Sequence, residues 1–489
     1  MMQHESVESP LPLVMGNEEE TGMIVKIDNQ YDEPYGMASN LARYIPQYLL
    51  GSHDEYLTNG FRIYVGGSED FDGPTNIERA TPECILPEDL NKYIRVGELV
   101  MDQIVGNYIA EASLENDAEI TVRMQRRVVD SLGNRKGCHD NFCIEDDSEI
   151  GETLEIIPQL KQFIATRNFI TGAGHFTGND GVFYSQKVDG LVEVNGYGYR
   201  GTVGRVVQDI DYMRLEIRCN DINISDWATQ IRLGGMGLML ALNELDELEK
   251  LDDYADYSSD LEYLDRIKKL NVMQLSNEGK ISLLNSQIHG LDYQQRVAEL
   301  ALNAIGMHID LPHNYYRIAK EIYDYCDDFR KVIAGKEDIK LLADRADWAA
   351  KFVNIRDGIE YDRDFGITRS FSDIKSQAAD LRYDFKEIKG DKDGIGSKKV
   401  GYGFKLRDRG KFRFNINEKL VIAAQSKPPE DTRAKLRAQL LEDINVKDCY
   451  WSSVSFRSTN NKNKIINLGP RDTFFSENDL QKIFSTEEL

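Results

Sequence analysis

Three consecutive glutamates interrupt a stretch of apolar and β-branched residues near the start of the chain. Residues 13–27 read LVMGNEEETGMIVKI, and the alternation after the acidic run predicts a β-strand. Because side chains alternate between the two faces of a strand, Glu18 and Glu20 are expected to share one face. Two carboxylates held side by side repel each other unless a cation lies between them, and Mg²⁺ prefers such oxygen ligands. The stretch therefore favours a metal site on a sheet, although a run of glutamates is also typical of a solvated strand end.

The size and charge of the chain restrict its function further. Its 489 residues are 41% hydrophobic, enough for a large core. The net charge of −24 repels phosphate backbones, so we expect no nucleic-acid partner. No apolar run approaches the roughly 18 residues that cross a bilayer, and the acidic amino terminus does not resemble a signal peptide. Six cysteines are too few for a disulfide scaffold, so we expect a cytoplasmic protein without membrane contact.

Strand and helix patterns alternate along the chain. Strands are predicted at 60–65, 120–124 and 141–144, with antiparallel hairpins between 181 and 219. Helices are predicted at 35–50, 87–112, 152–170, 225–250 (with Ser225 as its cap), 259–270, 292–306, 314–334, 338–355 and 432–441. Helices inserted between antiparallel strands predict an α+β fold. The Gly- and Lys-rich stretch 391–403 is the expected boundary between a large domain, 1–400, and a small C-terminal domain, 401–489.

A second polar region indicates what the acidic strand binds. Arg62 and Tyr64 are expected on one face of a strand, and a polar loop with further carboxylates leads to the segment IERATPEC at 77–84. An arginine, a phenol and carboxylates beside an acidic strand are the groups that an ATP–Mg²⁺ site requires. Each of them alone is ordinary surface chemistry.

Six short segments occur in the same order as in the proteasome accessory factor A family, which contains the Pup ligase and the Pup deamidase. They are MGNEEETG, TNGFRIYV, IERATPEC, GNRKGCHDN, FIATRNFITGAG and PPEDTRAKLR. The resemblance extends from about Val14 to Trp451. It implies a glutamine-synthetase-like fold, in which a concave antiparallel sheet packed with helices holds ATP and Mg²⁺, with a carboxylate–amine ligase-like catalytic domain and a small C-terminal domain.

The resemblance also implies a reaction. In the ligase, ATP phosphorylates the side-chain carboxylate of the C-terminal glutamate of Pup. A lysine amine of a target protein then displaces phosphate, which leaves an isopeptide bond. An acyl phosphate is needed because a free carboxylate is a poor electrophile.

Individual positions acquire roles from the same resemblance. It implies metal ligands at Glu18, Glu20, Tyr64, Glu78 and Glu216. It implies nucleotide contacts at Arg62, Thr81, Arg214, Arg433 and Trp451. Arg433 and its neighbour Arg437 are equally well interpreted as residues of a helix surface.

Three departures from the family pattern affect the catalytic step. Gly66 stands where the family has its catalytic aspartate, and the loop that follows is longer than usual. We expect Asp70 or Asp72 of this loop to act as the replacement base; the alternative is a solvated acidic loop without a base. Glu216 replaces a histidine, and residues 196–211 replace a stretch with arginines and a histidine, so the substrate and the attack step remain open.

The spacing between the first two motifs separates the two activities of the family. The deamidase carries a long insertion there, whereas only 41 positions separate Glu18 from Asn59. This favours a ligase that joins a Pup-like small protein to lysine-bearing target proteins, although the wording PPEDTRA is closer to the deamidase. The alternatives are a deamidase-like or depupylase-like amide hydrolase, a catalytically silent nucleotide-binding member, and a ligase for a free amino acid or small peptide.

Two further motifs are expected to be structural. Residues 196–201 spell G-x-G-x-x-G, but their flanks alternate like strands, whereas a dinucleotide site needs a helix after the motif. Cys138, His139 and Cys143 lack a second pair of ligands at zinc spacing and are interpreted as strand residues.

Overall fold

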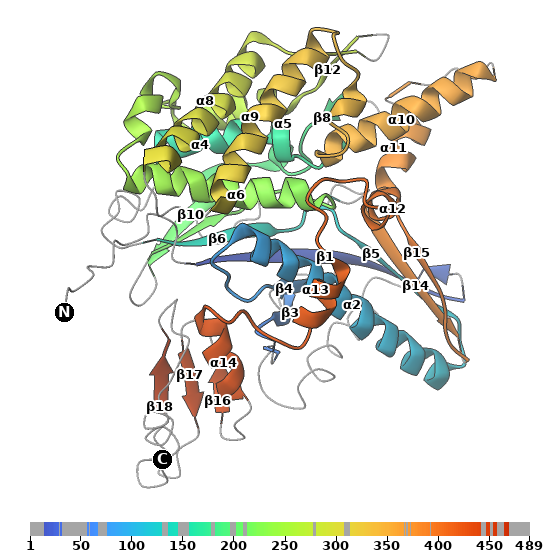
Figure 1. The fold of residues 1–489 in the computed structure, drawn as a ribbon. Helices are drawn as coiled ribbons and strands as arrows, with labels where there is room; N and C mark the ends of the chain where they lie inside the picture. Colours follow the sequence, from blue (N-terminus) through green and yellow to red (C-terminus); the bar gives the residue numbers. More distant parts are fainter. Residues whose placement is uncertain are drawn as a thin grey trace.

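Among the residues that the structure describes, eleven strands form a mostly antiparallel sheet at the centre of the computed structural model, and helices pack around it (Figure 1). The predicted α+β class is therefore confirmed. The structure describes residues 14–28, 30–31, 56–57, 59–66, 76–129, 135–144, 156–177, 181–195, 202–208, 213–276, 280–307, 313–365, 367, 370–371, 373–391, 393–441, 446–449, 453–456 and 464–468. The helix predicted at 35–50 lies outside these residues.

The described strands follow the chain in this order: β1 (Met15–Ile27), β2 (Gln30–Tyr31), β3 (Arg62–Gly66), β4 (Asn76–Ala80), β5 (Ile120–Gln125), β6 (Cys138–Ile144), β7 (His175–Thr177), β8 (Gly181–Phe183), β9 (Glu193–Asn195), β10 (Thr202–Gln208), β11 (Met213–Ile217), β12 (Gln274–Leu275), β13 (Ile281–Ser282), β14 (Phe385–Asp391), β15 (Gly394–Val400), β16 (Val446–Cys449), β17 (Ser453–Phe456) and β18 (Lys464–Asn467).

Strand β1 is the predicted acidic strand, and it lies in the middle of the sheet. Its first half lies between β4 and β6, and its second half is flanked by β2 and β5. From β6 the sheet continues through β11 and β10 to β9, and from β5 it continues through β14 to β15. The hairpin β10–β11 is antiparallel as predicted, but β9 pairs with β10 in parallel. Alternation alone misses this difference because it does not encode strand direction.

The helices are α2 (Pro87–Asn116), α4 (Pro158–Thr166), α5 (Asn168–Thr171), α6 (Asp226–Glu244), α7 (Asp260–Asn271), α8 (Asn285–Met307), α9 (His313–Ile333), α10 (Asp347–Asp364), α11 (Ile374–Leu381), α12 (Tyr402–Asp408), α13 (Glu418–Ala424) and α14 (Arg433–Leu441), with 3₁₀ helices η2 (Val188–Gly190), η3 (Leu248–Tyr254) and η4 (Ile339–Leu341). Figure 1 shows α4, α6, α8 and α9 grouped on one side of the sheet. The predictions at 87–112, 259–270, 292–306, 314–334 and 432–441 are confirmed as helices, with shifted ends.

Three predicted helices are wrong in their extent. The helix predicted at 225–250 ends at Glu244 as α6, and the 3₁₀ helix η3 follows it. Of the region 152–170, the described part becomes helical only at Pro158, because proline suits the first position of a helix and not its interior. In the region 338–355, the side chain of Asp338 caps a short 3₁₀ helix, and α10 begins only at Asp347. Capping side chains favour such short turns over continuous helix.

Ser225 caps α6 as predicted, and its loss should destabilise the protein. Its hydroxyl oxygen accepts a hydrogen bond from the amide of Ala228 at 3.2 Å, and its hydroxyl donates to the carbonyl of Arg345 at 2.5 Å. Ser225→Ala is therefore expected to lower the free energy of unfolding by about 1–2 kcal/mol. The shift of the urea midpoint measures this, with Ser397→Ala on the exposed strand β15 as the control. Equal midpoints for the two variants would contradict the assignment.

The stretch 391–403, expected as a domain boundary, contains all of β15 and the start of α12. Since β14 pairs with both β5 and β15, these residues extend the main sheet. A separate small core joins Tyr56 to residues of α14, β16 and β17. The division of the chain at residue 400 stays a prediction.

A buried network of ion pairs holds β1 on the face opposite to Glu18 and Glu20. Glu19 projects toward α2, where it forms ion pairs with Arg79 of β4 and with Arg126, and Arg126 also pairs with Glu98 of α2. The exposed fraction of each of these four side chains is at most 5%. Buried charges require such pairing. The network therefore holds in place the strand that carries the two glutamates on either side of Glu19.

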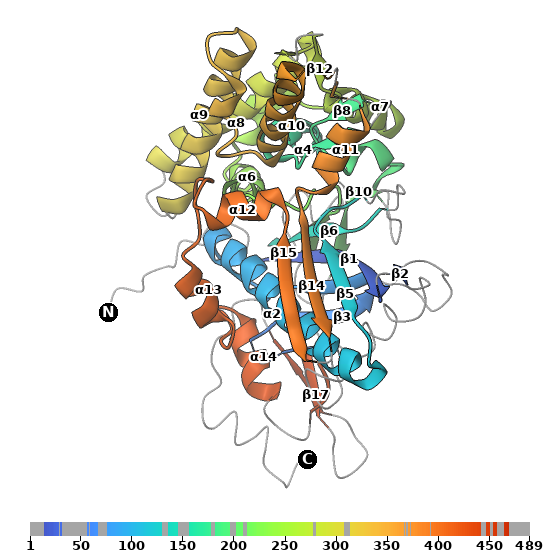
Figure 2. The same cartoon turned by 90° about the vertical axis from the view of Figure 1, so that its right-hand side faces the viewer.

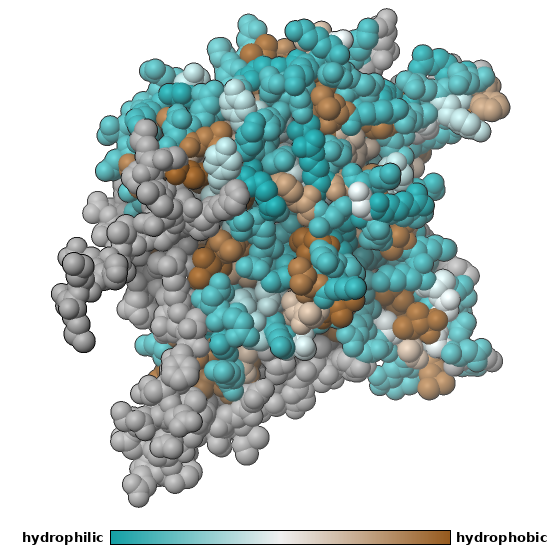
Figure 3. Space-filling model, in the orientation of Figure 1, coloured by the Kyte–Doolittle hydropathy of each residue, from teal (hydrophilic) through white to brown (hydrophobic). Residues whose placement is uncertain are grey.

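The surface and the cysteines have the properties that the composition predicts. The face seen in Figure 3 is mostly hydrophilic. Among the helices that the structure describes, none combines the length and the apolar character needed to cross a bilayer. All six cysteines are buried thiols, as expected for a chain without a disulfide scaffold.

Candidate functional site

Three adjacent strands bring acidic and phenolic side chains to one face of the sheet. Glu20 of β1 lies directly opposite Glu78 of β4, and Glu78 lies directly opposite Tyr64 of β3. Directly opposed residues of antiparallel strands project from the same face. Glu18 and Arg62, each two residues along its strand, therefore share this face too. Four of the five predicted metal ligands lie within this group.

The same face continues across β1 onto three further strands. Glu18 lies opposite His139 of β6, and Asn141 of β6 lies opposite Glu216 of β11. Glu216 in turn lies opposite Arg205 of β10. The fifth predicted ligand, Glu216, thus shares this face with the other four, although β6 lies between β11 and β1 in the sheet.

Glu18, His139 and Glu216 form a group that could hold a metal ion. One potential ligand atom from each lies within 4.8 Å of the other two. The Nδ1 atom of His139 is 3.3 Å from Oε2 of Glu18 and 3.4 Å from Oε1 of Glu216. His139 does lie in a strand, as predicted, but it is also a candidate site residue that the sequence analysis missed. The only local signal was its alternation with Asn141 along β6.

Glu216 is also paired with arginines that the sequence analysis did not single out. Its Oε2 lies 2.5 Å from Nε of Arg205, and its Oε1 lies 3.0 Å from Nε of Arg218. The side chain of Glu216 is 2% exposed. A buried carboxylate is stabilised by such cations, so Glu216 has a structural partner whether or not it binds a metal.

Burial and neighbouring negative charges raise the pKa of Glu78. Burial is the largest cause, the charges of Glu20 and Glu18 add to it, and together they raise the pKa to about 7 against the hydrogen bond with Tyr64. A carboxyl group with a pKa near neutrality beside two other carboxylates indicates that negative charge is not fully compensated around Glu78. A divalent cation would supply the compensating charge, and the oxygen donors present are those that Mg²⁺ prefers.

Positive side chains surround Glu18. Burial alone would raise its pKa, but the hydrogen bond with His139 and the positive charges of His139, Arg214 and Arg62 outweigh burial and lower the pKa. The guanidinium of Arg62 lies over the ring of Tyr64, 4.3 Å from its centroid. Arg62 and Arg214 thus flank the carboxylates, where they would meet the phosphate groups of a metal-bound nucleotide.

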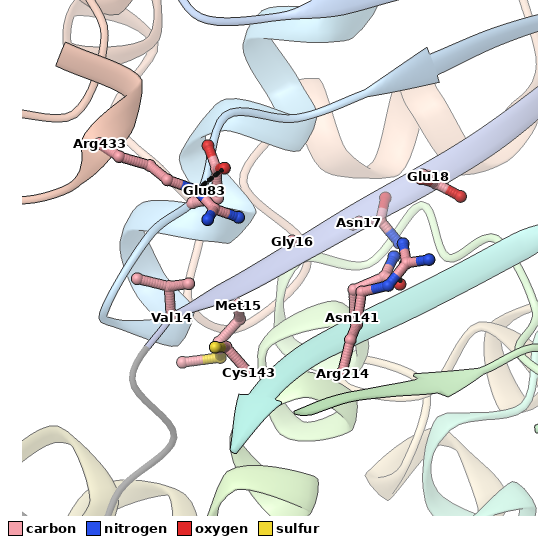
Figure 4. A pocket seen from close by; sticks show the side chains of 10 residues that line it. All are labelled: Val14, Met15, Gly16, Asn17, Glu18, Glu83, Asn141, Cys143, Arg214 and Arg433. Atoms are coloured by element: carbon pink, nitrogen blue, oxygen red, sulfur yellow. Dashed lines mark hydrogen bonds and ion pairs between the residues drawn. The ribbon is translucent and has the colours of Figure 1, made fainter. Parts of the chain in front are cut away.

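A pocket beside the start of β1 connects Glu18 to the C-terminal part of the chain. Its lining residues are Val14, Met15, Gly16, Asn17, Glu18, Glu83, Asn141, Cys143, Arg214 and Arg433. Figure 4 shows Glu18 near one end and Arg433 with Glu83 near the other. Two predicted nucleotide contacts, Arg214 and Arg433, therefore line one pocket with the first predicted metal ligand.

Arg433 and Arg437 have a structural partner that the sequence did not reveal. Nε of Arg433 lies 2.8 Å from Oε1 of Glu83, and a nitrogen of Arg437 lies 2.6 Å from Oε2. Burial would raise the pKa of Glu83, but the charges and hydrogen bonds of Arg437 and Arg433 lower it to about 2. The triad fixes α14 to the segment after β4. The nucleotide contact of Arg433 stays a prediction.

The remaining predicted residues divide into two groups. Thr81 is buried, and its hydroxyl oxygen accepts a hydrogen bond from the amide of Asn17 at 3.0 Å. Its nucleotide contact stays a prediction. Asp70, Asp72 and Trp451 lie outside the described residues. The G-x-G-x-x-G stretch at 196–201 lies outside them as well.

The chain is similar to known proteins over most of its length. The chain matches the family model described as "Pup-ligase protein" over residues 18–455. The Pup–protein ligase of Bifidobacterium adolescentis is 26% identical over 425 residues, which cover 84% of this chain and 81% of that protein. The depupylase of Acidothermus cellulolyticus is 25% identical over 425 residues, which cover 83% and 76%. The two identities are too similar to separate the two activities.

Solved structures share the fold. The crystal structure of a complex between the prokaryotic ubiquitin-like protein Pup and its ligase matches with a TM-score of 0.74 at 20% identity, covering 97% of this chain and 93% of that one. A Pup ligase in complex with ADP matches with a TM-score of 0.67 at 20% identity, covering 92% and 94%. The expected sheet architecture is thereby confirmed.

Proposed function

The chain belongs to the Pup-ligase family, and from this membership we propose that it is an ATP- and Mg²⁺-dependent ligase. It would join a glutamate side chain of a Pup-like protein to a lysine amine of a target protein. The short connection of 41 positions between Glu18 and Asn59 supports a ligase over a deamidase. The solved relatives that bind Pup and ADP support the choice of substrate and nucleotide.

One observation carries the proposal: the shared face on which Glu20, Glu78 and Tyr64 oppose one another with Glu18 two residues away. These four side chains would hold the metal, with Glu216 as a further ligand. Bound Mg²⁺ would neutralise the phosphate oxygens of ATP and the charge that develops on them. Arg62 and Arg214 would add positive charge beside the same oxygens.

The reaction has two steps. A carboxylate oxygen of the donor glutamate attacks the γ-phosphorus of ATP, a new O–P bond forms, and ADP leaves. The lysine amine then attacks the acyl carbon, the C–O bond to phosphate breaks, and inorganic phosphate leaves. The amine gives up its proton to a carboxylate base, for which we propose Asp70 or Asp72. Arg62 and Arg214 would stabilise the negative charge of the transferred phosphoryl group.

A depupylase-like hydrolase is the second candidate, because the depupylase relative is nearly as similar as the ligase. The deciding experiment incubates the protein with ATP, Mg²⁺, a lysine-bearing target and a Pup-like carrier that ends in glutamate. We expect ADP and a carrier–target conjugate. Consumption of a carrier that ends in glutamine, or of a preformed conjugate, in the absence of ligation would instead support the hydrolase. Tight ATP binding without either reaction would support a silent member of the family.

The replacement base gives a separate prediction. We expect either Asp70→Asn or Asp72→Asn to lower the rate of conjugation by about 10²–10⁴-fold, the usual effect of losing a general base. ATP binding, measured by calorimetry, should be unchanged. Glu69→Gln in the same loop is the matched control and should retain activity. Full activity in both aspartate variants would exclude this loop as the source of the base.

A further inference from the structure

Asn141 of β6 lines the pocket beside the start of β1, and the proposed function gives it no role. Figure 2 shows β1 and β6 side by side, and the register places Asn141 directly opposite Gly16 of β1. Gly16 lies two residues before Glu18, so both positions belong to the face that carries the predicted metal ligands. Next to Asn141 on this face, β1 therefore presents no side chain.

Gly16 leaves open space that the fold does not require. A Cβ atom at position 16 would approach no atom more closely than Oγ1 of Thr81, at 4.0 Å. Gly16 does not have the positive φ that favours glycine, so other residues could adopt its conformation. Glycine weakens a strand and often marks a position where a ligand approaches the backbone closely. We therefore interpret Gly16 as the floor of a small hollow within the pocket.

Arg214 of β11 borders the same hollow with a charge that no carboxylate neutralises directly. It is half-buried and lines the pocket together with Gly16 and Asn141. Within the described part of the chain, its guanidinium forms no ion pair, and it donates a hydrogen bond to Oδ1 of Asn141 at 3.4 Å. Arg205 and Arg218, by contrast, are both paired with Glu216. Arg214 thus has donors and charge available for an anion.

The contact with Arg214 determines how the side-chain amide of Asn141 is oriented. A guanidinium only donates hydrogen bonds, so the amide oxygen faces Arg214 and the amide nitrogen faces away from it. That nitrogen donates to no atom of the described residues. Asn141 is half-buried, so its nitrogen is open to the pocket. The oxygen of Asn141 therefore orients Arg214, while its nitrogen provides a second donor beside Gly16.

We propose that Asn141 is a further nucleotide-binding residue, whose amide nitrogen donates a hydrogen bond to a phosphate oxygen that lies over Gly16 and also contacts Arg214. This inference rests on the proposed function, because it assigns the hollow to the phosphate chain of ATP. Both donors belong to strands of one sheet, so little order has to be created on binding. Glu18 lies beside the hollow, where a metal ion that it binds would meet the same phosphate chain.

Two substitutions separate binding from folding. Asn141→Asp keeps the size of the side chain and the acceptor for Arg214, but it replaces the free donor by a negative charge that repels phosphate. Gly16→Ala adds a methyl group to the hollow, where no close neighbour opposes it. Neither variant should lower the thermal unfolding midpoint. The matched control is Asn417→Asp, which introduces the same charge at the exposed cap of α13, where aspartate also caps a helix.

The experiment measures binding by calorimetry on the full chain in the presence of Mg²⁺. ATP and inorganic tripolyphosphate are titrated separately into wild type and the three variants. We expect Asn141→Asp and Gly16→Ala to weaken the binding of both ligands by about tenfold or more, as for the loss of a charged hydrogen bond. Asn417→Asp should match wild type.

The outcomes distinguish this proposal from the proposed function. If wild type binds tripolyphosphate but not ATP, and Asn141→Asp weakens that binding, the phosphate hollow is supported while the nucleotide of the proposed function is contradicted. A loss confined to ATP would place Asn141 beside the base or the ribose and overturn the proposal. Wild-type affinity in Asn141→Asp or Gly16→Ala, or no binding of either ligand by wild type, would also overturn it.

Discussion

Replacing Glu18 by glutamine is expected to lower ATP-dependent conjugation by about a hundredfold or more at saturating substrate. Glu18 lies opposite His139 of β6 and two residues before Glu20, which lies opposite Glu78 of β4. It therefore adjoins the potential ligands on both neighbouring strands. Glutamine keeps the shape of the side chain but removes the negative charge that attracts a divalent cation. The rate of conjugate formation at increasing Mg²⁺ concentrations measures the effect, and higher Mg²⁺ should restore part of the activity.

The control for this variant is Glu115→Gln. Glu115 is an exposed carboxylate near the end of α2, remote in the chain from the acidic face. It should leave both the rate and the Mg²⁺ dependence unchanged. An activity of Glu18→Gln within threefold of wild type would remove Glu18 from the metal site and with it the central part of the proposed function.

The acidic strand could be predicted because its signal is local. The alternation of residues 13–27 is visible in the sequence, and alternation alone places Glu18 and Glu20 on one face. The partners of that face could not be derived in the same way. His139 lies 121 residues from Glu18 along the chain, and its position depends on the register between β1 and β6. Register is a property of the whole sheet, since a shift of one residue would turn every side chain to the other face.

Buried ion pairs could not be predicted from the sequence either, because their partners are also far apart along the chain. Glu19 belongs to the acidic run, yet its partner Arg126 is 107 residues away, and nothing near either residue indicates the pairing. The same holds for Arg433, whose ion pair with Glu83, 350 residues earlier in the chain, has no local signal in the sequence. A charged residue in a sequence carries no local mark that distinguishes a ligand contact from a structural ion pair. Only the burial of the side chain and its distances to other charged atoms in the folded structure distinguish a ligand contact from a structural ion pair.

Glu83→Gln is expected to lower the free energy of unfolding by about 3–5 kcal/mol. The carboxylate of Glu83 is buried with Arg433 and Arg437, so neutralising it leaves two guanidinium groups without their counter-charge. Thermal and urea unfolding of the full chain measure the loss. Glu430→Gln is the matched control, because Glu430 forms an exposed ion pair with Lys435 near the same helix. Exposed pairs contribute little to stability, so this variant should behave as wild type.

The same carboxylate should make the stability of the protein depend on pH. The pKa of Glu83 is lowered from 4.5 to about 2 in the folded state, which corresponds to about 3 kcal/mol. Because the folded-state pKa is the lower one, this contribution is fully present above about pH 4.5 and is lost as the pH falls toward 2. The stability difference between wild type and Glu83→Gln should therefore be constant from pH 7 to 5 and narrow below pH 4.5. A difference that stays constant down to pH 3 would show that the variant acts through packing and not through the charge of Glu83.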